Sequence, residues 1–311
     1  MIMNASEIAV VATGGTIACE ADATGALVPR RTAAELIESA GVDVPCRPVD
    51  VRAVDSSSMT LADVDALIAV VHEQLADPSV AGVVVTHGTD SLAETAFALD
   101  LFHSDPRPVV VTGAQRAADA EDPDGPGNVR AAVEHIVSGG DLSKGVVVAF
   151  GGQIHPARGL VKTDTHALDA FRPTVSNGAV APVRPDPIAP VALAGATIPV
   201  VAAWAGADGS IVDAVAALKP DGIVVEGLGS GNVSDEMGQA LLRAIDAGIP
   251  VVITTVVPGG KVEFAYGGAG GGATLGSRGA IPGGWLRAGQ ARIALAAAVS
   301  AGVDPRTLIG G

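Results

Sequence analysis

Aromatic residues are scarce in this chain of 311 residues, which has five phenylalanines, two tryptophans and a single tyrosine, Tyr266. A core or cleft built from this sequence must therefore consist mainly of Val, Ile, Leu and Ala. Cysteine is rarer still, because Cys19 and Cys46 are the only two. Two cysteines cannot form the disulfide framework that stabilises many secreted domains. We therefore expect a protein of a reducing, cytoplasmic compartment.

Positive charge and long apolar runs are also lacking. Lys and Arg together number 19 against 34 Asp and Glu, which gives a formal net charge of −15. Nucleic-acid binding depends on concentrated Lys and Arg, so this balance argues against a nucleic-acid partner. No apolar run reaches the roughly 18 residues of a membrane-spanning helix, and the first residues lack the basic and apolar parts of a signal peptide. We expect no membrane partner either.

The chain instead alternates short apolar runs with amphipathic stretches, a pattern that predicts a parallel sheet covered by helices. Helix-start signals, with an acidic residue three positions on, occur at Thr32, Thr60 and Ser91. In the second half, helices are predicted at residues 208–218, 234–247 and 288–301. The predicted strands cover residues 7–12, 49–54, 82–86, 108–112 and 145–150, and then residues 200–204, 222–226 and 250–256.

Length and composition predict two domains, because a domain holds roughly 150 residues. Five prolines between residues 182 and 199 prevent a continuous helix or central strand there. We expect a larger α/β domain at residues 1–184, a proline-rich linker at residues 185–199 and a smaller α/β domain at residues 200–311. Residues 266–284 hold nine glycines and no periodicity, which predicts a flexible loop.

Polar residues follow the predicted strands of the first domain. In parallel sheets, ligands bind at the carboxyl ends of the strands, where loops converge and helix N-termini present free N–H groups. The sequence therefore predicts a ligand site made of these segments. They are TGGT from Thr13, DSSS from Asp55, HGTD from His87, TGAQ from Thr112, and the basic pair Arg158 and Lys162 after the fifth strand.

The TGGT segment allows three interpretations. Its glycines could simply supply the positive φ of a turn, or they could cradle a phosphate, although no Gly-Lys-Ser/Thr follows. Alternatively, Thr13 could be a nucleophile, provided that a neighbouring base takes its proton. Lys162 is a candidate base in a chain of only four lysines, because a desolvated lysine can lose a proton and arginine cannot. The alternative is that Lys162 is a solvated surface residue.

The HGTD segment also has a purely structural interpretation, since Asp90 or Ser91 is well placed to cap a helix. His87 by itself would suggest a metal, but the six histidines are scattered and no second His or Cys stands at ligand spacing. We therefore predict no metal and no cofactor. The G-x-S-x-G turn of serine hydrolases is absent as well.

Seven short segments occur in a fixed order along the whole chain. The first and third are VVATGGTIA at residues 10–18 and VVVTHGTDSLAETA at residues 83–96. The others are DSSSM at 55–59, TGAQ at 112–115, DGPGN at 124–128, ARGLVKTDT at 157–165 and GLGSGN at 227–232. In this order they resemble the segments of the bacterial-type L-asparaginase/glutaminase family. The resemblance implies a threonine amidohydrolase that converts L-asparagine to L-aspartate and ammonia, with glutamine a weaker or negligible substrate.

The resemblance also implies roles for single residues. Thr13 matches the nucleophile, and the second catalytic group is matched by Thr89, Asp90 and Lys162. Substrate-binding positions are matched by Ser56, Ser57, Gly88, Asp90, Ala114 and Asn232. Asn232 is expected to reach the site from a neighbouring subunit. The implied architecture is a larger flavodoxin-like domain and a smaller C-terminal α/β domain, assembled as a homo-oligomer, either a dimer or a tetramer of intimate dimers.

The chain departs from the family pattern in three places. Residues 19–31 contain no tyrosine, although many members place one there over the nucleophile, and Thr24 is their only hydroxyl residue. Ser57 replaces a longer side chain, which changes the room for glutamine. A carboxylate that some members supply from the C-terminal domain has no clear counterpart. Two alternatives stay open: a tRNA-dependent amidotransferase subunit, and a non-catalytic amino-acid-binding protein.

Overall fold

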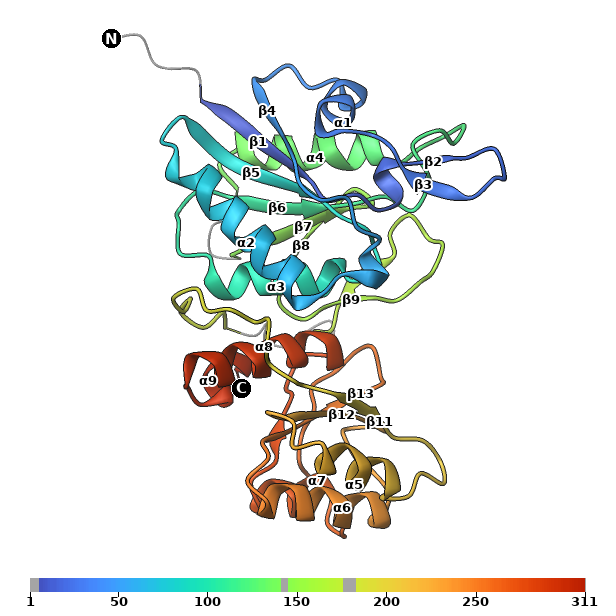
Figure 1. Ribbon diagram of the computed structural model, residues 1–311, viewed down its shortest axis with the longest axis vertical. Helices are drawn as coiled ribbons and strands as arrows, with labels where there is room; N and C mark the ends of the chain where they lie inside the picture. Colours follow the sequence, from blue (N-terminus) through green and yellow to red (C-terminus); the bar gives the residue numbers. More distant parts are fainter. Residues whose placement is uncertain (1–5, 141–144, 176–182, 311) are drawn as a thin grey trace. The chain divides into compact units, whose positions relative to one another are not determined.

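A computed structural model describes residues 6–140, 145–175 and 183–310 of the chain (Figure 1). The chain forms two compact units, which divide between Arg172 and Pro173. Each unit is a parallel sheet covered by helices, so the predicted α/β architecture with a larger first and a smaller second domain is confirmed. Residues 185–199 have no helix or strand, but Leu193 and Ile198 within them are buried. Their role as a linker stays a prediction.

The larger unit is built on a six-stranded sheet in the order β4-β1-β5-β6-β7-β8. The first five strands run parallel, and β8 runs antiparallel to β7. In chain order the parallel strands follow the 2-1-3-4-5 arrangement of flavodoxin-like folds, as the resemblance implied. The strands are β1 (Glu7–Ala12), β4 (Cys46–Asp50), β5 (Val80–Thr86), β6 (Val109–Thr112), β7 (Val147–Phe150) and β8 (Gln153–Pro156).

Helices cover both faces of this sheet, which explains why its strands are almost wholly apolar. Figure 1 shows α1 and α4 on one face, and α2 and α3 on the other. Thr32 and Thr60 begin α1 and α2 with capping boxes, in which the threonine and the acidic residue three positions on cap each other's backbone. The helices are α1 (Ala33–Ala40), α2 (Leu61–Ala76), α3 (Leu92–Phe102) and α4 (Gly125–Val137).

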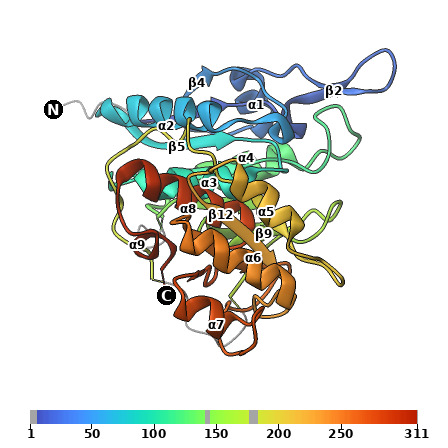
Figure 2. The same cartoon turned by 60° about the horizontal axis from the view of Figure 1, so that its bottom comes forward.

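Several short elements complete the larger unit. A hairpin of β2 (Cys19–Ala21) and β3 (Leu27–Pro29) projects beyond the sheet, as Figures 1 and 2 show. The 3₁₀ turns η1 (Thr16–Ala18) and η2 (Ser56–Ser58) follow the ends of β1 and β4, respectively. The strands β9 (Leu160–Lys162) and β10 (Phe171–Pro173) pair with each other.

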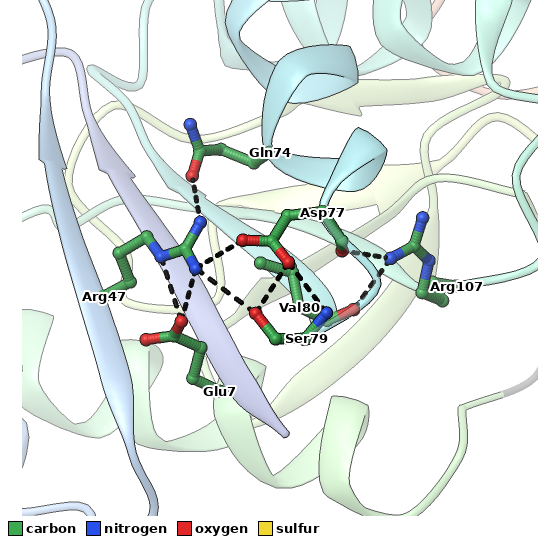
Figure 3. A network of polar contacts seen from close by, with 7 residues as sticks. All are labelled: Glu7, Arg47, Gln74, Asp77, Ser79, Val80 and Arg107. Carbon is green, nitrogen blue, oxygen red and sulfur yellow. Dashed lines mark hydrogen bonds and ion pairs between the residues drawn. The ribbon is translucent and has the colours of Figure 1, made fainter. Parts of the chain in front are cut away.

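Two arginines fasten the amino-terminal ends of the main strands (Figure 3). Arg47 of β4 pairs with Glu7 of β1 and, at 2.7 Å, with Asp77 after α2. Arg107 donates to the carbonyl oxygens of Asp77 and Val80, each at 2.9 Å. The Arg47 guanidinium holds the pKa of the Asp77 carboxyl well below its usual range. This network leaves the carboxyl ends of the strands, at the opposite edge, available for ligands.

The smaller unit has a four-stranded parallel sheet in the order β11-β12-β13-β14. One face packs on α5, α6 and α7 through residues such as Val225, Ile253, Met237 and Leu275, and α8 lies on the other face. Figure 2 shows α5 and α6 side by side. The elements are β11 (Val200–Ala202), α5 (Ser210–Ala217), β12 (Ile223–Gly227), α6 (Asp235–Asp246), β13 (Val251–Thr255), α7 (Gly272–Ser277), β14 (Ile281–Pro282), α8 (Ala288–Ala301) and α9 (Pro305–Ile309).

The strand predicted at residues 49–54 was misplaced. The observed β4 spans Cys46–Asp50 and pairs with β1 at the edge of the sheet. An edge strand tolerates Pro48 and charged residues, so its sequence lacks the apolar signal of a central strand. Beyond Asp50 the chain leaves the sheet, and the Val54 N–H donates to the Thr13 carbonyl oxygen at 2.9 Å.

The flexible loop predicted at residues 266–284 was also wrong, since this stretch contains α7 and β14. Its glycines serve close packing. A Cβ on Gly272 or Gly276 would lie 2.6 or 2.5 Å from the Phe264 ring, and one on Gly270 would lie 2.1 Å from the Val233 carbonyl oxygen. Glycine enrichment therefore marks tight contact between backbones and an aromatic ring here.

Helix α4 was not predicted, although its signals are present in the sequence. Pro126 stands in its first turn, and its buried face consists of Val129, Ala132, Val133 and Ile136 at helical spacing. Within residues 6–140, 145–175 and 183–310, no helix is both long and apolar enough to cross a membrane.

Candidate active site

Three neighbouring parallel strands, β1, β5 and β6, end at the same edge of the larger sheet. Thr13 follows β1, residues 87–90 follow β5 and residues 113–115 follow β6. The strand order reverses between β1 and β5, because the chain goes from β1 to β4 on one side and later returns to β5 on the other. Ligands of such sheets bind at this switch point. The polar segments predicted from the sequence therefore lie where a ligand is expected.

The backbones that follow β1 and β5 approach each other too closely for side chains. A Cβ on Gly15 would lie 2.3 Å from the Gly88 Cα, and a Cβ on Gly88 would lie 2.5 Å from Ser56 Oγ. Gly15 also has a φ of +80°. Gly15 and Gly88 are thus required by this close approach, and Gly15 also by its positive φ. Thr13 and Thr89 each lie within two residues of it, so it brings both threonines to one place.

Thr13 is buried and held by the end of the neighbouring strand β5. Its N–H and its Oγ1 both donate to the Thr86 carbonyl oxygen, at 3.1 and 2.9 Å. Only 4% of the residue is exposed. The lone pairs of Oγ1 stay available, while its proton is held by a neutral acceptor that cannot remove it. A nucleophilic Thr13 thus needs a base from another part of the site.

Lys162, Thr89 and Asp90 form a cluster beside this segment. Lys162 Nζ donates to Thr89 Oγ1 at 2.8 Å and lies 3.8 Å from Asp90 Oδ1. Thr89 is 6% exposed, and 23% of the Lys162 side chain is exposed against 58% for Asp90. Lys162 is therefore largely covered and engaged with a buried hydroxyl, unlike a solvated surface lysine. The arrangement can transfer a proton between an amine and a hydroxyl next to an accessible carboxylate.

Ser56 is tied to the same cluster through the backbone. The Asp90 N–H donates to Ser56 Oγ at 3.1 Å, and Ser91 Oγ donates to the Ser56 carbonyl oxygen at 2.7 Å. Asp55 caps the 3₁₀ turn by accepting the Ser57 N–H at 3.3 Å. Ser56 is buried, whereas Ser57 is exposed. Of the two predicted caps, Ser91 occupies the N-cap position of α3, but its side chain makes no cap hydrogen bond.

His87 is buried and neutral. Burial lowers the pKa of its imidazole to about 4, against the opposing effect of the Gly88 carbonyl oxygen, which lies 2.7 Å from Nδ1. That contact makes Nδ1 the protonated nitrogen. Nε2 lies 3.0 Å from Met59 Sδ. Over the described part of the chain, no three His, Cys, Asp or Glu side chains gather as metal ligands would.

The TGAQ turn after β6 is fixed by residues of α4. Asp124 accepts the N–H groups of Gln115 and Arg116, at 3.1 and 2.9 Å. Asn128 Nδ2 donates to the Gly113 carbonyl oxygen at 3.0 Å. Ala114 is fully buried and offers only its backbone. Gln115, Asp124 and Asn128 belong to the TGAQ and DGPGN segments, but no role for these three side chains was predicted from the sequence.

The hairpin of residues 19–31 lies directly after the TGGT segment. Asp22 Oδ1 accepts from the Thr24 N–H and hydroxyl at 2.7 and 2.6 Å, so the only hydroxyl of the hairpin closes its own turn. At the base, Cys19 Sγ donates to the Gly15 carbonyl oxygen at 3.2 Å. Burial raises the pKa of the Cys19 thiol. The Thr24 hydroxyl is therefore already engaged within its own turn.

Asn232 belongs to the smaller unit. Its N–H and carbonyl oxygen both bond Leu228, at 2.8 Å each, and close a tight turn through Gly229 and Gly231 after β12. Of the nine predicted site residues, the eight others all lie in the larger unit: Thr13, Ser56, Ser57, Gly88, Thr89, Asp90, Ala114 and Lys162.

Comparison with known proteins gives a consistent result over nearly the whole chain. The family model of the asparaginase N-terminal domain matches residues 7–189, and that of the glutaminase/asparaginase C-terminal domain matches residues 197–309. A probable L-asparaginase of Deinococcus radiodurans is 37% identical, with 96% of this chain and 94% of the relative covered. An L-asparaginase of Bacillus licheniformis is 31% identical, with 93% of this chain and 94% of the relative covered.

A solved structure is similar as well. The crystal structure of a probable cytoplasmic L-asparaginase from Campylobacter jejuni is 28% identical and superposes with a TM-score of 0.78, covering 98% of both chains. The matched models leave only residues 190–196 between them unassigned. The two family models and the 37% identical relative cover nearly the whole chain, and the flavodoxin-like strand order is consistent with them. The chain belongs to the asparaginase family of amidohydrolases.

Proposed function

We propose that this protein hydrolyses the side-chain amide of L-asparagine to L-aspartate and ammonia through an acyl-enzyme on Thr13. The observation that carries the proposal is the 2.8 Å contact between Lys162 Nζ and the buried Thr89 hydroxyl, with Asp90 beside it. This proton-transfer pair lies one residue from the close approach of Gly15 and Gly88, and Thr13 lies two residues from it on the other backbone. The names of the similar proteins support the same substrate.

The reaction proceeds in two steps. Thr13 Oγ1 attacks the amide carbon, and the proton that it loses is delivered to the amide nitrogen, which leaves as ammonia. A water molecule then adds to the Thr13 ester, releases aspartate and returns a proton to Thr13. The Thr89–Lys162 pair accepts and returns protons in both steps, and backbone N–H groups at Thr89 and the glycine turn stabilise the negative oxygen.

Substrate orientation comes from groups of opposite character. The accessible carboxylate of Asp90 binds the α-ammonium group, and Ser56 with neighbouring backbone N–H groups binds the α-carboxylate. Gly88 and Ala114 contribute backbone only. The small Ser57 side chain stands where family members hold a longer one, and we infer that glutamine, with its extra methylene, is the weaker substrate. A homo-oligomer in the cytoplasm, with Asn232 contributed by a neighbouring subunit, completes the proposal.

A coupled ammonia assay with L-asparagine, L-glutamine and D-asparagine tests this function. We expect Thr13→Ala to lower ammonia release from L-asparagine by about 10²–10⁴-fold, because the nucleophile is lost. Thr24→Ala is the matched control, since Thr24 is exposed at the hairpin turn, and its activity should stay within about twofold of the wild type. Full activity of Thr13→Ala would exclude the proposed nucleophile.

The two alternatives predict different outcomes of the same assay. A non-catalytic binding protein would show asparagine binding in calorimetry and no aspartate after hours. An amidotransferase subunit would need a partner protein to release ammonia. The latter is not favoured, because the relatives that this chain covers over 94% of their length are named as asparaginases.

A further inference from the structure

The TGAQ segment ends in a glutamine whose side chain reaches the Thr89–Lys162 pair. Gln115 Oε1 lies 3.5 Å from Thr89 Oγ1, and Gln115 Nε2 donates to the Ala167 carbonyl oxygen at 3.1 Å. We propose that Gln115 is a positioning residue for Thr89. Its side-chain oxygen accepts a hydrogen bond from the Thr89 hydroxyl, and its NH₂ group connects Thr89 to the loop that follows Lys162. The inference rests on the proposed function, in which Thr89 transfers protons.

The direction of each hydrogen bond follows from the donors and acceptors present. The Ala167 carbonyl oxygen can only accept, so the Gln115 NH₂ group faces it and the Gln115 carbonyl oxygen faces Thr89. That oxygen can only accept as well. The Thr89 hydroxyl proton therefore points toward Gln115, and a lone pair of Thr89 Oγ1 faces the N–H of Lys162. Gln115 thus selects one orientation of a hydroxyl that would otherwise rotate freely.

The Gln115 backbone is rigidly supported from α4. Asp124 accepts its N–H at 3.1 Å, and Asn128 holds the Gly113 carbonyl oxygen at 3.0 Å. Asn128 Oδ1 accepts the Gly151 N–H at 3.1 Å, which connects the turn to the end of β7. The side chain is consequently presented from a turn held on two sides.

The far end of the Gln115 amide is anchored to an ordered loop. Asp164 Oδ1 accepts the N–H groups of His166 and Ala167, at 2.7 and 2.8 Å, and so holds the residue whose carbonyl oxygen Gln115 binds. Ala167 stands five residues after Lys162 in the chain. Gln115 therefore links the strand end that carries Thr89 to the segment that carries its amine partner.

The unequal lengths of the two contacts suit a proton that must move. At 3.5 Å the contact of Thr89 with Gln115 is at the weak end of hydrogen bonding, whereas the 2.8 Å contact with Lys162 is short. Gln115 therefore orients the Thr89 hydroxyl in the absence of substrate. Because this hydrogen bond is weak, the Thr89 hydroxyl can exchange it at small cost for one to substrate or water. Gln115 should affect turnover more than substrate binding, because Asp90 and Ser56 hold the charged groups of the substrate.

Gln115→Met tests this inference, since methionine keeps the side-chain length and removes both hydrogen bonds. We expect kcat for L-asparagine to fall by about 10- to 100-fold, the cost of a misplaced catalytic group, while KM stays within about threefold. Gln74→Met is the matched control. Gln74 is likewise half-buried and accepts from Arg47 at 3.4 Å, at the opposite edge of the sheet. Its kcat and KM should equal those of the wild type.

Gln115→Glu supplies a readout that a merely structural role would not move. The protonated carboxyl can still donate to Ala167 and accept from Thr89, whereas the carboxylate cannot donate. The kcat ratio of Gln115→Glu to wild type should therefore fall as pH rises through the ionisation of the new carboxyl, from about pH 4 to 6. The charged groups around this position are Lys162 and Asp90 beside Thr89, Asp124 and Arg116 beside the Gln115 backbone, and Asp164 and His166 in the loop of Ala167. They shift the midpoint without changing the sign. The ratio for Gln115→Met should stay constant over the same range.

Three results would overturn the inference. The first two are a Gln115→Met kcat within twofold of the wild type and a pH-independent ratio for Gln115→Glu. A loss of kcat that is accompanied by an equal loss of thermal stability and a rise in KM also overturns it, because it indicates a structural role. If the wild-type protein forms no aspartate from L-asparagine, the proposed function itself is contradicted. The asparagine assay on the wild type shows this before any variant is compared.

Discussion

Burial of His87 makes the stability of the larger unit depend on pH. Desolvation holds the pKa of the folded imidazole at about 4, whereas an unfolded histidine titrates near 6.5. Above about pH 6.5 both states are neutral. As the pH falls from there toward 4, the unfolded chain binds a proton that the folded chain does not, so the free energy of unfolding decreases. The full effect amounts to about 3 kcal/mol.

We expect His87→Asn to remove this part of the pH dependence. The asparagine amide can still donate to the Gly88 carbonyl oxygen but does not titrate. In urea unfolding at pH 7.5 and pH 4.5, the variant should lose about 2–3 kcal/mol less than the wild type between the two pH values. His166→Asn is the control, because His166 is exposed, and it should follow the wild type. The same pH dependence for His87→Asn and wild type would contradict the buried neutral imidazole.

Single residues differed in how far the sequence could predict them. Thr13 stands directly after an apolar run, and the HGTD segment that contains Thr89 follows another. The strand ends therefore indicated both segments, whereas the role of Thr89 came from the resemblance. Lys162 was selected by its chemistry and by the resemblance. Gln115 escaped selection because an amide is neutral and common, and its effect depends on which end faces which neighbour. That orientation follows from the Ala167 carbonyl oxygen, 52 residues away in the chain.

The ends of β1 and β5 approach each other so closely that we expect only glycine to fit at position 15. Gly15 has a φ of +80°, and a Cβ on it would lie 2.3 Å from the Gly88 Cα. Gly25, in the hairpin turn, has a similar φ of +85° with no atom within 4 Å of its would-be Cβ. Alanine at Gly25 thus meets backbone strain alone, and alanine at Gly15 meets the same strain together with a collision.

Gly25→Ala should therefore cost about 1 kcal/mol in free energy of unfolding, and Gly15→Ala about 2–4 kcal/mol, with loss of asparagine hydrolysis. Urea unfolding of both variants measures the difference, and the ammonia assay measures the consequence for the site. Equal costs for the two variants would mean that the two backbones do not meet at Gly15.

The spacing of apolar residues predicted the elements that pack through their side chains. It failed for elements that pack through the backbone of glycine residues. Helix α8 was predicted with its observed bounds, because buried alanines recur along it beside Ile293 and Leu295, and Gly302 ends it with a φ of +66°. Helix α7 was missed, because Gly272 and Gly276 face the Phe264 ring with no side chain of their own. Edge strand β4 was misplaced for a related reason, since one of its sides pairs with no strand and its residues need not be apolar.

For the whole molecule, the flavodoxin-like order could be inferred only as part of the family resemblance. Alternating strands and helices predict a parallel sheet, but many strand orders satisfy that pattern. The same holds for Asn232, which periodicity places only at a turn after β12. Its proposed role in a neighbouring subunit comes from the resemblance alone. The net charge of −15 disfavours non-specific association of copies, so association of copies would indicate a specific interface.

Complementation between two inactive variants tests this assembly. If Asn232 acts in a neighbouring subunit, Thr13→Ala and Asn232→Ala should each be impaired when expressed alone. In a mixed dimer one of the two sites combines an intact Thr13 with an intact Asn232, so co-expressed chains carrying different tags, purified through both tags, should recover about half of the wild-type activity. If Asn232 acts in its own chain, both sites of the mixed dimer keep one defect and no activity returns. Failure to capture mixed species through both tags would contradict the homo-oligomer, and an Asn232→Ala variant with full activity would remove Asn232 from the site.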